Sequence, residues 1–368
     1  MPERIGVLTG GGDCAGLNSA IKWVTKTALD PLLAAKRNME FEVLGIRDGW
    51  RGLVDVDPND PVSMERWICP LNELLVRTWD RHGGTNLGSS RTNPFEPGND
   101  QSEKVMKNLE ALGIDYLVAI GGDDTLGVAH QLHTIGVKVV GIPKTIDRDL
   151  NGTDYTLGYD TALNVIADDV DKLRTTAGSH GRIFVVETMG RHAGWLALEG
   201  GEAAGAHVIL IPEWDFEMER VAALLRLRRE AGVRYDIVVV SEGAKSRGGD
   251  EVYLSDKTDG FGHKVLGGIG RTVAKAVAQI TGYETRHVVL SHLQRGGPPS
   301  AMDRLMGRHF GIAAVDLILN EDFGRMVAWL QGRIASVPLK VAIEELRVVD
   351  IENQYDTERY NGRRSSLL

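Results

Sequence analysis

Short apolar runs alternate with longer amphipathic segments along most of the chain. Short runs rich in Val, Ile and Leu are typical of buried strands, and apolar residues spaced three or four apart indicate helices. The expected strands cover residues 5–9, 41–46, 116–120, 137–142, 182–187, 207–211, 237–240 and 288–290. The expected helices cover residues 16–29, 102–112, 126–133 (capped by Thr125) and 161–176. This alternation predicts an α/β fold with parallel sheets that carry helices on both faces.

The length of 368 residues is enough for two domains. We expect the chain to cross into the second domain at residues 158–160, just before the helix 161–176. Residues 352–366 are polar, and we expect them to be poorly ordered.

The composition narrows the class of protein. Hydrophobic residues make up 42% of the chain and charged residues 25%, which is ordinary for a globular protein. The formal net charge of −9 argues against a nucleic-acid partner, and without a run of 18 apolar residues no membrane span is expected. The first strand leaves no room for a signal peptide, and two distant cysteines, Cys14 and Cys69, favour a reducing, cytoplasmic location.

A glycine-rich turn, Gly10-Gly11-Gly12-Asp13-Cys14-Ala15, follows the first strand. It fits the G-x-G-x-x-A pattern of dinucleotide-binding turns, which is a weak signal alone. Three glycines let backbone amides approach a ligand, and the positive end of the next helix favours phosphate. A tight strand–helix turn without a ligand fits the same residues. A GK[ST] ending is absent, so the turn is not a P-loop.

Carboxylates gather after two neighbouring strands, in Gly121-Gly122-Asp123-Asp124-Thr125 and in Pro143-Lys144-Thr145-Ile146-Asp147-Arg148-Asp149. Parallel strands deliver such residues to one edge of a sheet, where carboxylates suit Mg²⁺, and Mg²⁺ with lysine suits phosphate. In an extended segment Thr145, Asp147 and Asp149 share one face. There Asp147 can accept the proton of an attacking hydroxyl, with Asp149 supporting it or the metal. The structural alternatives are a helix N-cap for the aspartate pair and an Asx-rich turn for the second segment.

Arginines accompany further glycine-rich segments. The motif Met189-Gly190-Arg191-His192-Ala193-Gly194 follows one strand, and Ser291-His292-Leu293-Gln294-Arg295-Gly296-Gly297 follows another. Arg91 ends a third such segment, and Arg182 and Arg286 begin their strands. Guanidinium groups beside glycines suit phosphate, although a single arginine is usually a solvated surface charge.

Together these segments resemble the phosphofructokinase family from residue 5 to about residue 319. Five motifs match in order: GGGDCAGLN, GGDDTLG, PKTIDRD, MGRHAG and SHLQRGG. The resemblance implies two Rossmann-like three-layer α/β domains with mainly parallel sheets. Residues 1–158 plus about 295–340 would bind the phosphoryl donor, and residues 159–294 plus the C-terminal segment would bind fructose 6-phosphate.

The resemblance also implies roles for individual residues. Fructose 6-phosphate would be held by Thr145, Met189, Gly190, Arg191, Glu242, His292 and Arg295. Arg182 and Arg286 would reach the sugar phosphate of a neighbouring subunit, which requires a homodimer or homotetramer. The donor would lie on Gly11 and Arg91, and Asp123 would bind Mg²⁺. The catalytic groups would be Asp147, the base for the 1-hydroxyl, with Asp124, Lys144 and Arg191.

Asp124 and Lys144 resemble the branch of the family that uses pyrophosphate in place of ATP. ATP-using members typically carry glycine at the first position and often at the second. A glycine leaves room for an α-phosphate and adenosine, whereas an aspartate fills that space and repels a third phosphate. Lys144 would offer a mobile positive charge to pyrophosphate.

Two positions depart from the family pattern, namely Arg148 where Asn is usual and Ala15 where Pro is usual. We expect Arg148 to lie between its neighbouring carboxylates and lower their pKa values, or to contact phosphate. An ATP-dependent or mixed-donor phosphofructokinase is an alternative function. A dinucleotide oxidoreductase, with Asp48 for the ribose, leaves the carboxylates and arginines unexplained, and a non-catalytic sugar-phosphate sensor needs no base.

Overall fold

The computed structural model describes residues 2–37, 39–258 and 261–364. Within them the largest sheet has seven strands in the order β15-β14-β7-β6-β1-β2-β3. In chain order these strands are Glu3–Thr9 (β1), Phe41–Ile46 (β2), Ile68–Leu71 (β3), Tyr116–Gly121 (β6), Val139–Pro143 (β7), Arg325–Leu330 (β14) and Arg333–Pro338 (β15). Only the edge strands β3 and β15 pair antiparallel to their neighbours in this sheet. The central strands β1, β6 and β7 therefore end at the same edge.

Helices cover both faces of this sheet. Ile5 and Val7 of β1 pack into a cluster with α1 (Leu17–Ala28) and α12 (Ala301–Leu319). Leu8 points the other way, because successive strand residues alternate between faces, and it packs on the opposite side of the sheet. The helices on that side are α3 (Trp50–Asp55), α6 (Ser102–Ala111), α7 (Asp123–Thr134) and α13 (Leu339–Glu344). Burying each such aliphatic side chain contributes about 1.5–3 kcal/mol, so the three layers hold the sheet edge in place.

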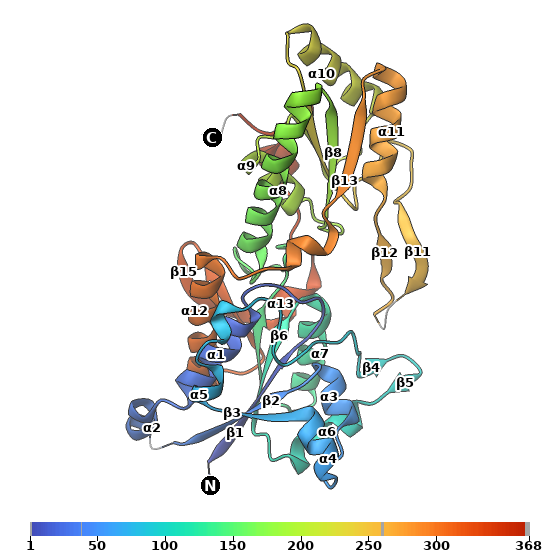
Figure 1. Cartoon of the computed structure of the whole chain (residues 1–368). Coiled ribbons are helices and arrows are strands. Elements are labelled where there is room, and N and C mark those ends of the chain that lie inside the picture. Colours follow the sequence, from blue (N-terminus) through green and yellow to red (C-terminus); the bar gives the residue numbers. More distant parts are fainter. Residues whose placement is uncertain (1, 38, 259–260, 365–368) are drawn as a thin grey trace.

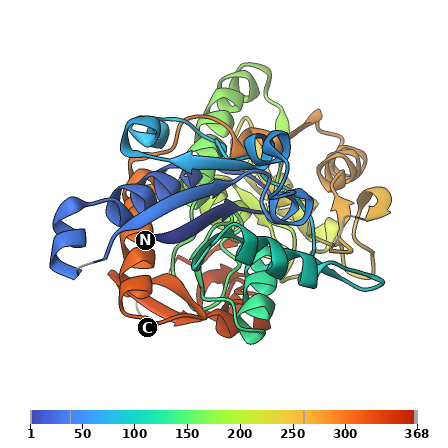
Figure 2. The same cartoon turned by 90° about the horizontal axis from the view of Figure 1, so that it is seen from below.

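A second, fully parallel sheet has four strands among the described residues, in the order β13-β8-β10-β9. They are Ile183–Thr188 (β8), Val208–Leu210 (β9), Asp236–Ser241 (β10) and Thr285–Val289 (β13). The helices α8 (Tyr159–His180) and α9 (Trp195–Ala203) lie on one side of it, and α10 (Met218–Glu230) and α11 (Ile269–Thr281) on the other (Figure 1). The seven-stranded and four-stranded sheets thus form two halves of the molecule, seen end-on in Figure 2.

The remaining elements are short. The helices are Pro31–Arg37 (α2), Pro61–Trp67 (α4), Glu73–Val76 (α5), Ile351–Gln354 (α14) and the 3₁₀ turns Trp79–Arg81 (η1) and Ser291–Arg295 (η2). The strands form three antiparallel pairs: Phe95–Glu96 with Asn99–Asp100 (β4, β5), Tyr253–Thr258 with Lys264–Leu266 (β11, β12) and Tyr355–Asp356 with Asn361–Gly362 (β16, β17).

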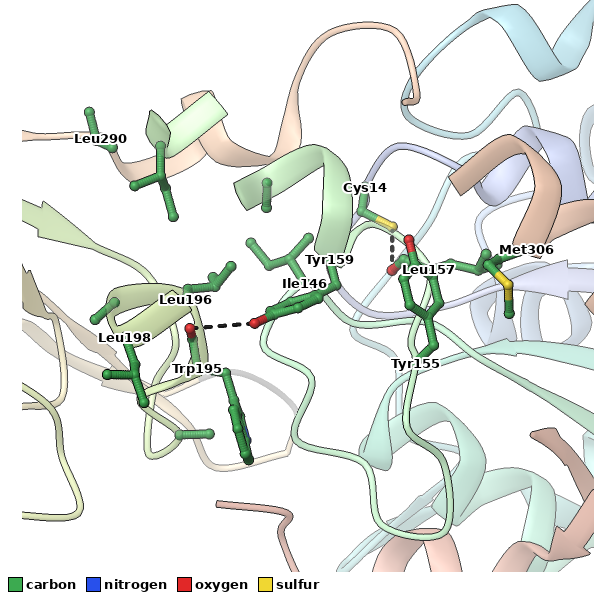
Figure 3. Close-up of a cluster of buried hydrophobic side chains, with 14 of the residues drawn as sticks. Cys14, Ile146, Tyr155, Leu157, Tyr159, Trp195, Leu196, Leu198, Leu290 and Met306 are labelled. Carbon is green, nitrogen blue, oxygen red and sulfur yellow. Dashed lines mark hydrogen bonds between the residues drawn. The ribbon is translucent and has the colours of Figure 1, made fainter. Parts of the chain in front are cut away.

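An apolar junction joins the two halves (Figure 3). The Sγ atom of Cys14, in the first turn, donates to the carbonyl oxygen of Leu157 at 3.3 Å. Two residues later Tyr159 opens α8 and directs its hydroxyl at the carbonyl oxygen of Trp195, 3.5 Å away. Burial raises the pKa of the Cys14 thiol well above its usual range, so this cysteine is an inert part of the core.

The structure confirms the predicted α/β class with mainly parallel sheets, and each expected strand and helix is present, most of them with shifted ends. At the expected crossing near residue 158, Gly158 is the left-handed N-cap of α8. Three expectations are wrong or incomplete. Thr125 does not cap α7, which starts two residues earlier after Gly122. The tail is ordered through residue 364, with Tyr355 and Tyr360 buried, while residues 365 and 366 lie outside the described residues. The sequence pattern did not reveal β3, β14, β15 or the pair β11–β12.

Among the described residues, no helix is long and apolar enough to cross a membrane.

Candidate active site

The first glycine turn needs its glycines for two separate reasons. Gly11 has a φ of 75°, a left-handed conformation that favours glycine. At Gly12 a Cβ atom would lie 1.9 Å from a guanidinium nitrogen of Arg295, so a larger residue would require that side chain to shift. The amides of Gly10 and Gly11 bond to carbonyl oxygens of the protein at 3.0 and 3.1 Å, and α1 begins only at Leu17. These two amides are therefore paired within the protein, and Gly11 and Gly12 line the same pocket as Arg295.

Asp123 and Asp124 form the first turn of α7, at the end of β6. Negative charge at a helix N-terminus is favourable, which compensates in part for placing two carboxylates together. Burial, followed by the neighbouring charge of Asp124, raises the pKa of Asp123. Asp124 also contacts His263, whose Nε2 atom lies 3.2 Å from each of the Asp124 carboxylate oxygens.

Lys144 and the turn after it form the floor of the same pocket. The Lys144 side chain is 4% exposed and its ammonium donates to the carbonyl oxygen of Gly12 at 2.5 Å, so the lysine lies against the first glycine turn. Residues 146 and 147 form a turn within positions 145–149, which are therefore not the extended segment that the sequence predicted. The turn is held by the amide of Asp147, which donates to the Thr145 hydroxyl at 3.1 Å.

The turn nevertheless brings Asp147 and Asp149 together. Both are buried, at 7% and 8% exposure. Burial, followed by the charge of Asp147 and then that of Asp123, raises the pKa of Asp149 to about 8. The Oδ1 atom of Asp147 is buried without a hydrogen-bond partner among the described residues. A buried carboxylate oxygen left in this way is ready to accept a proton from a bound group.

Arg148 does not lie between these carboxylates, so that expectation is wrong. Its φ of 56° turns the side chain away from the pocket. The guanidinium forms an ion pair with Glu199 and lies 5.0 Å from the ring centres of both Tyr159 and Trp195. Arg148 therefore connects the segment 145–149 to α8 and α9 of the other half.

The other half contributes the ends of its strands from the facing side. Arg191, after β8, has a φ of 48°, and its amide donates to Glu242, after β10, at 3.3 Å. A Cβ atom on Gly243 would lie 1.8 Å from the Arg191 carbonyl oxygen, so the two loops are in close contact. Burial, then the charge of Asp147, raises the pKa of Glu242 to about 7.

Two adjoining cavities collect most of the predicted site residues. The first is lined by Gly11, Arg91, Asp123, Asp124, Lys144, Thr145, Asp147, Asp149, Arg191 and Arg295. The second, of about 540 Å³, is lined by Arg91, Met189, Arg191, Glu242, His292 and Arg295 together with residues of the β11–β12 pair. Arg91, Arg191 and Arg295 border both cavities. Their three guanidinium groups therefore lie at the boundary between the two cavities, where a chemical group transferred from one cavity to the other would pass. Gly190 is not among the described residues that line these two cavities. Its φ of 135° shapes the loop after β8 that carries Arg191.

Arg182 and Arg286 lie at the opposite ends of their strands. Arg182 directly precedes β8 and Arg286 is the second residue of β13. Both pair with one carboxylate oxygen of Glu284, at 2.9 and 2.6 Å. Neither side chain lines the cavities of its own chain among the described residues.

No sequence motif indicated His263 as a site residue. It lies 139 positions from Asp124, in a segment without a motif, and only the folded chain brings them together.

Comparison with known proteins agrees with this geometry. The phosphofructokinase family model matches residues 4–318. The pyrophosphate–fructose 6-phosphate 1-phosphotransferase of Amycolatopsis methanolica is 46% identical over 98% of this chain and 100% of its own length. The ATP-dependent 6-phosphofructokinase of Chloroflexus aurantiacus is 43% identical over 94% of this chain and 93% of its own.

A solved structure of phosphofructokinase from Saccharomyces cerevisiae superposes with a TM-score of 0.78 at 29% identity, covering 93% of this chain. This chain spans 45% of the length of that yeast chain. The family match and the two relatives show that the chain belongs to the phosphofructokinase family. The first glycine turn is therefore part of a phosphofructokinase fold and not of a dinucleotide oxidoreductase.

Proposed function

We propose that this chain transfers a phosphoryl group from pyrophosphate to the 1-hydroxyl of fructose 6-phosphate, reversibly, giving fructose 1,6-bisphosphate and phosphate. The observation that carries the proposal is the placement of Asp124 and Lys144 in one pocket with Asp147. Relatives over almost the whole chain that bear the pyrophosphate-dependent name support the same donor.

Asp147 acts as the general base in this proposal. Its partnerless Oδ1 atom accepts the proton of the 1-hydroxyl as the sugar oxygen attacks the near phosphorus of pyrophosphate. A new O–P bond forms while the bridging O–P bond breaks, and phosphate leaves. Lys144 and Arg191 stabilise the negative charge on the transferred group, since phosphoryl transfer depends mainly on positioning and on charge stabilisation.

The residues present fit a magnesium ion bound together with the donor. No group of three or more His, Cys, Asp and Glu side chains within the described part of the chain could hold a metal alone. Mg²⁺ is commonly held by one or two carboxylates, waters and substrate phosphates, which suits Asp123. Its raised pKa reflects a carboxylate whose charged form lacks compensation in the protein alone. When bound, the ion neutralises charge on the donor phosphates.

Fructose 6-phosphate occupies the second cavity in this proposal. Met189, Gly190, Arg191, Glu242, His292 and Arg295 hold the sugar phosphate with Thr145, while Gly11 and Arg91 hold the donor. The seven-stranded half, residues 1–158 plus about 295–340, is the donor domain, and residues 159–294 with the C-terminal segment form the sugar domain. Arg182 and Arg286 complete the sugar site of a second copy, so the enzyme is a homodimer or homotetramer. We place it in the cytoplasm, with no nucleic-acid or membrane partner.

An ATP-dependent reaction is the second candidate, because relatives at 43% identity bear that name. Initial rates with fructose 6-phosphate and either pyrophosphate or ATP as sole donor separate the two. We expect kcat/KM to be higher for pyrophosphate, and an Asp124→Gly variant to shift the ratio towards ATP. Equal or faster use of ATP by the unmodified enzyme contradicts the proposal. If neither donor yields product, the remaining alternative is a non-catalytic sugar-phosphate sensor.

A further inference from the structure

The pair β11–β12 reaches from the sugar half to the donor half. We refer to the described residues of positions 253–266 as the hairpin. Figure 1 shows it extending from the end of α11 towards the half that contains α7. Phe261, near its end, packs against the apolar cluster under α3, α6 and α7, which belongs to the seven-stranded half. The hairpin is therefore anchored on the half opposite to the one from which it comes.

The second anchor is the contact between His263 and Asp124. The Nε2 atom lies 3.2 Å from both carboxylate oxygens, and a carboxylate only accepts hydrogen bonds when ionised, so Nε2 donates. The two side chains are 33% and 22% exposed, which leaves the contact partly shielded from water. It fixes the carboxylate in one orientation at the start of α7.

His263 lies between the cavities proposed to bind the two substrates. Asp124 lines the first cavity, and His263 lines the second together with Tyr253, Leu254 and Leu266. The hairpin thus forms a wall of the sugar cavity and, through His263, touches the residue that the proposed function assigns to donor choice. Among the described residues, no other side chain lies within hydrogen-bonding distance of the Asp124 carboxylate.

We propose that His263 is a positioning residue for donor choice that acts through Asp124, an inference that rests on the proposed function. By donating to the carboxylate, His263 keeps Asp124 in the space that a nucleotide would need. The same hydrogen bond withdraws negative charge from the side that faces pyrophosphate, so the site accepts two phosphates and excludes a longer donor. The reaction itself proceeds on Asp147 and the cations.

The His263→Ala variant tests this inference. We expect the ratio of kcat/KM for pyrophosphate to kcat/KM for ATP to fall about tenfold, as for one lost hydrogen bond to a charged group. The change should lie mainly in KM for pyrophosphate, while KM for fructose 6-phosphate changes less than about twofold. His263→Gln, whose amide can still donate, should restore most of the ratio. Titration with imidodiphosphate, followed by calorimetry, should show weaker binding to His263→Ala without requiring turnover.

A matched control and a double variant separate positioning from general damage. His130→Ala removes a half-buried histidine of α7 that is not among the described residues lining either cavity, and should leave the donor ratio unchanged. If His263 acts through Asp124, Asp124→Ala and the double variant Asp124→Ala/His263→Ala should have the same donor ratio. Equal losses with both donors, an unchanged ratio, or additive effects in the double variant would overturn the inference.

Failure of the inference and failure of the proposed function give different results. If the unmodified enzyme prefers ATP, the proposed donor is wrong, and the role assigned to His263 falls with it. If the unmodified enzyme prefers pyrophosphate and His263→Ala keeps the same ratio, only the role of His263 is wrong.

Discussion

The ammonium group of Lys144 donates a hydrogen bond to the carbonyl oxygen of Gly12 and joins the first glycine turn to the catalytic turn. The lysine is almost fully buried, and burial lowers its pKa. A carboxylate cluster lies beside it, formed by Asp123, Asp147 and Asp149. In the proposed donor site the lysine thus lies against the first glycine turn before any substrate binds, and such preorganisation reduces the rearrangement needed during a reaction.

Replacing Asp147 by Ser should remove the general base. Such assistance is typically worth about 10²–10⁴-fold, so kcat should fall by that factor while KM for fructose 6-phosphate changes much less. Steady-state kinetics on protein with an unchanged melting temperature measures this. A variant that retains near-normal kcat would exclude Asp147 from the role.

Arg182 and Arg286 should serve the active site of another subunit. In their own chain they lie at the opposite end of the sheet and pair with Glu284, whose pKa the Arg182 contact lowers. Mixing inactive Arg182→Ala subunits with inactive Asp147→Ser subunits should recover part of the activity, because some interfaces then contain one intact site. Hybrids that are shown to form, yet remain inactive, would indicate sites built within one chain.

Arg148 should stabilise the fold more than it contributes to chemistry. It forms a partly buried ion pair with Glu199 and lies against two aromatic rings. Arg148→Ala leaves that carboxylate with the Tyr159 hydroxyl but without its cation, and should lower the free energy of unfolding by roughly 3 kcal/mol in urea titrations. As a control, Arg51→Ala breaks an exposed pair with Asp55 and should cost less than about 1 kcal/mol. Losses of equal size would contradict this account of Arg148.

His207 should make the protein sensitive to acid. Burial, then the charges of Arg228 and Arg174, lowers the pKa of His207 to about 4. Its Nδ1 atom accepts the amide hydrogen of Ile237 at 2.9 Å, and protonation would break that bond, even though Asp236 lies nearby. The unfolded chain, with an ordinary pKa of about 6.5, binds the proton first, so stability is lost as pH falls from about 6.5 towards 4.

The measurement for His207 is the free energy of unfolding at pH 7 and pH 5. The loss due to this residue should be roughly 2 kcal/mol, and His207→Asn, which retains an acceptor, should remove most of it. Because Asp236 also has a raised pKa and acts in the opposite direction, the difference between variant and parent is the quantity to compare. His180→Asn, at the exposed end of α8, serves as the control. A parent and His207→Asn variant with the same loss would refute the assignment.

Sequence patterns predicted the central strands because these are short apolar runs buried on both faces. They did not reveal β14 (Arg325–Leu330) and the edge strand β15 (Arg333–Pro338), which pair antiparallel at one end of the sheet and are less completely buried than the central strands. The motifs after β1, β6 and β7 indicated which residues meet, since parallel strands share an edge. They did not predict the turn at residues 146 and 147 or the left-handed conformation of Arg148 that follows it.

Tertiary contacts explain the remaining differences. Arg148 was expected beside phosphate because its sequence neighbours are aspartates, yet Glu199 and Trp195 attract it to the other half. His263 belongs to a hairpin without a recognisable motif, and its contact with Asp124 arises only when the two halves assemble.

The most direct test of the central claim is the reverse reaction, followed by ³¹P nuclear magnetic resonance without nucleotide. The enzyme is incubated with fructose 1,6-bisphosphate, inorganic phosphate and Mg²⁺. The account predicts a pyrophosphate resonance that grows together with fructose 6-phosphate, and that stays absent with the Asp147→Ser variant. If pyrophosphate fails to form while ADP in place of phosphate yields ATP, then the donor assigned to the pocket of Asp124 and Lys144 is wrong.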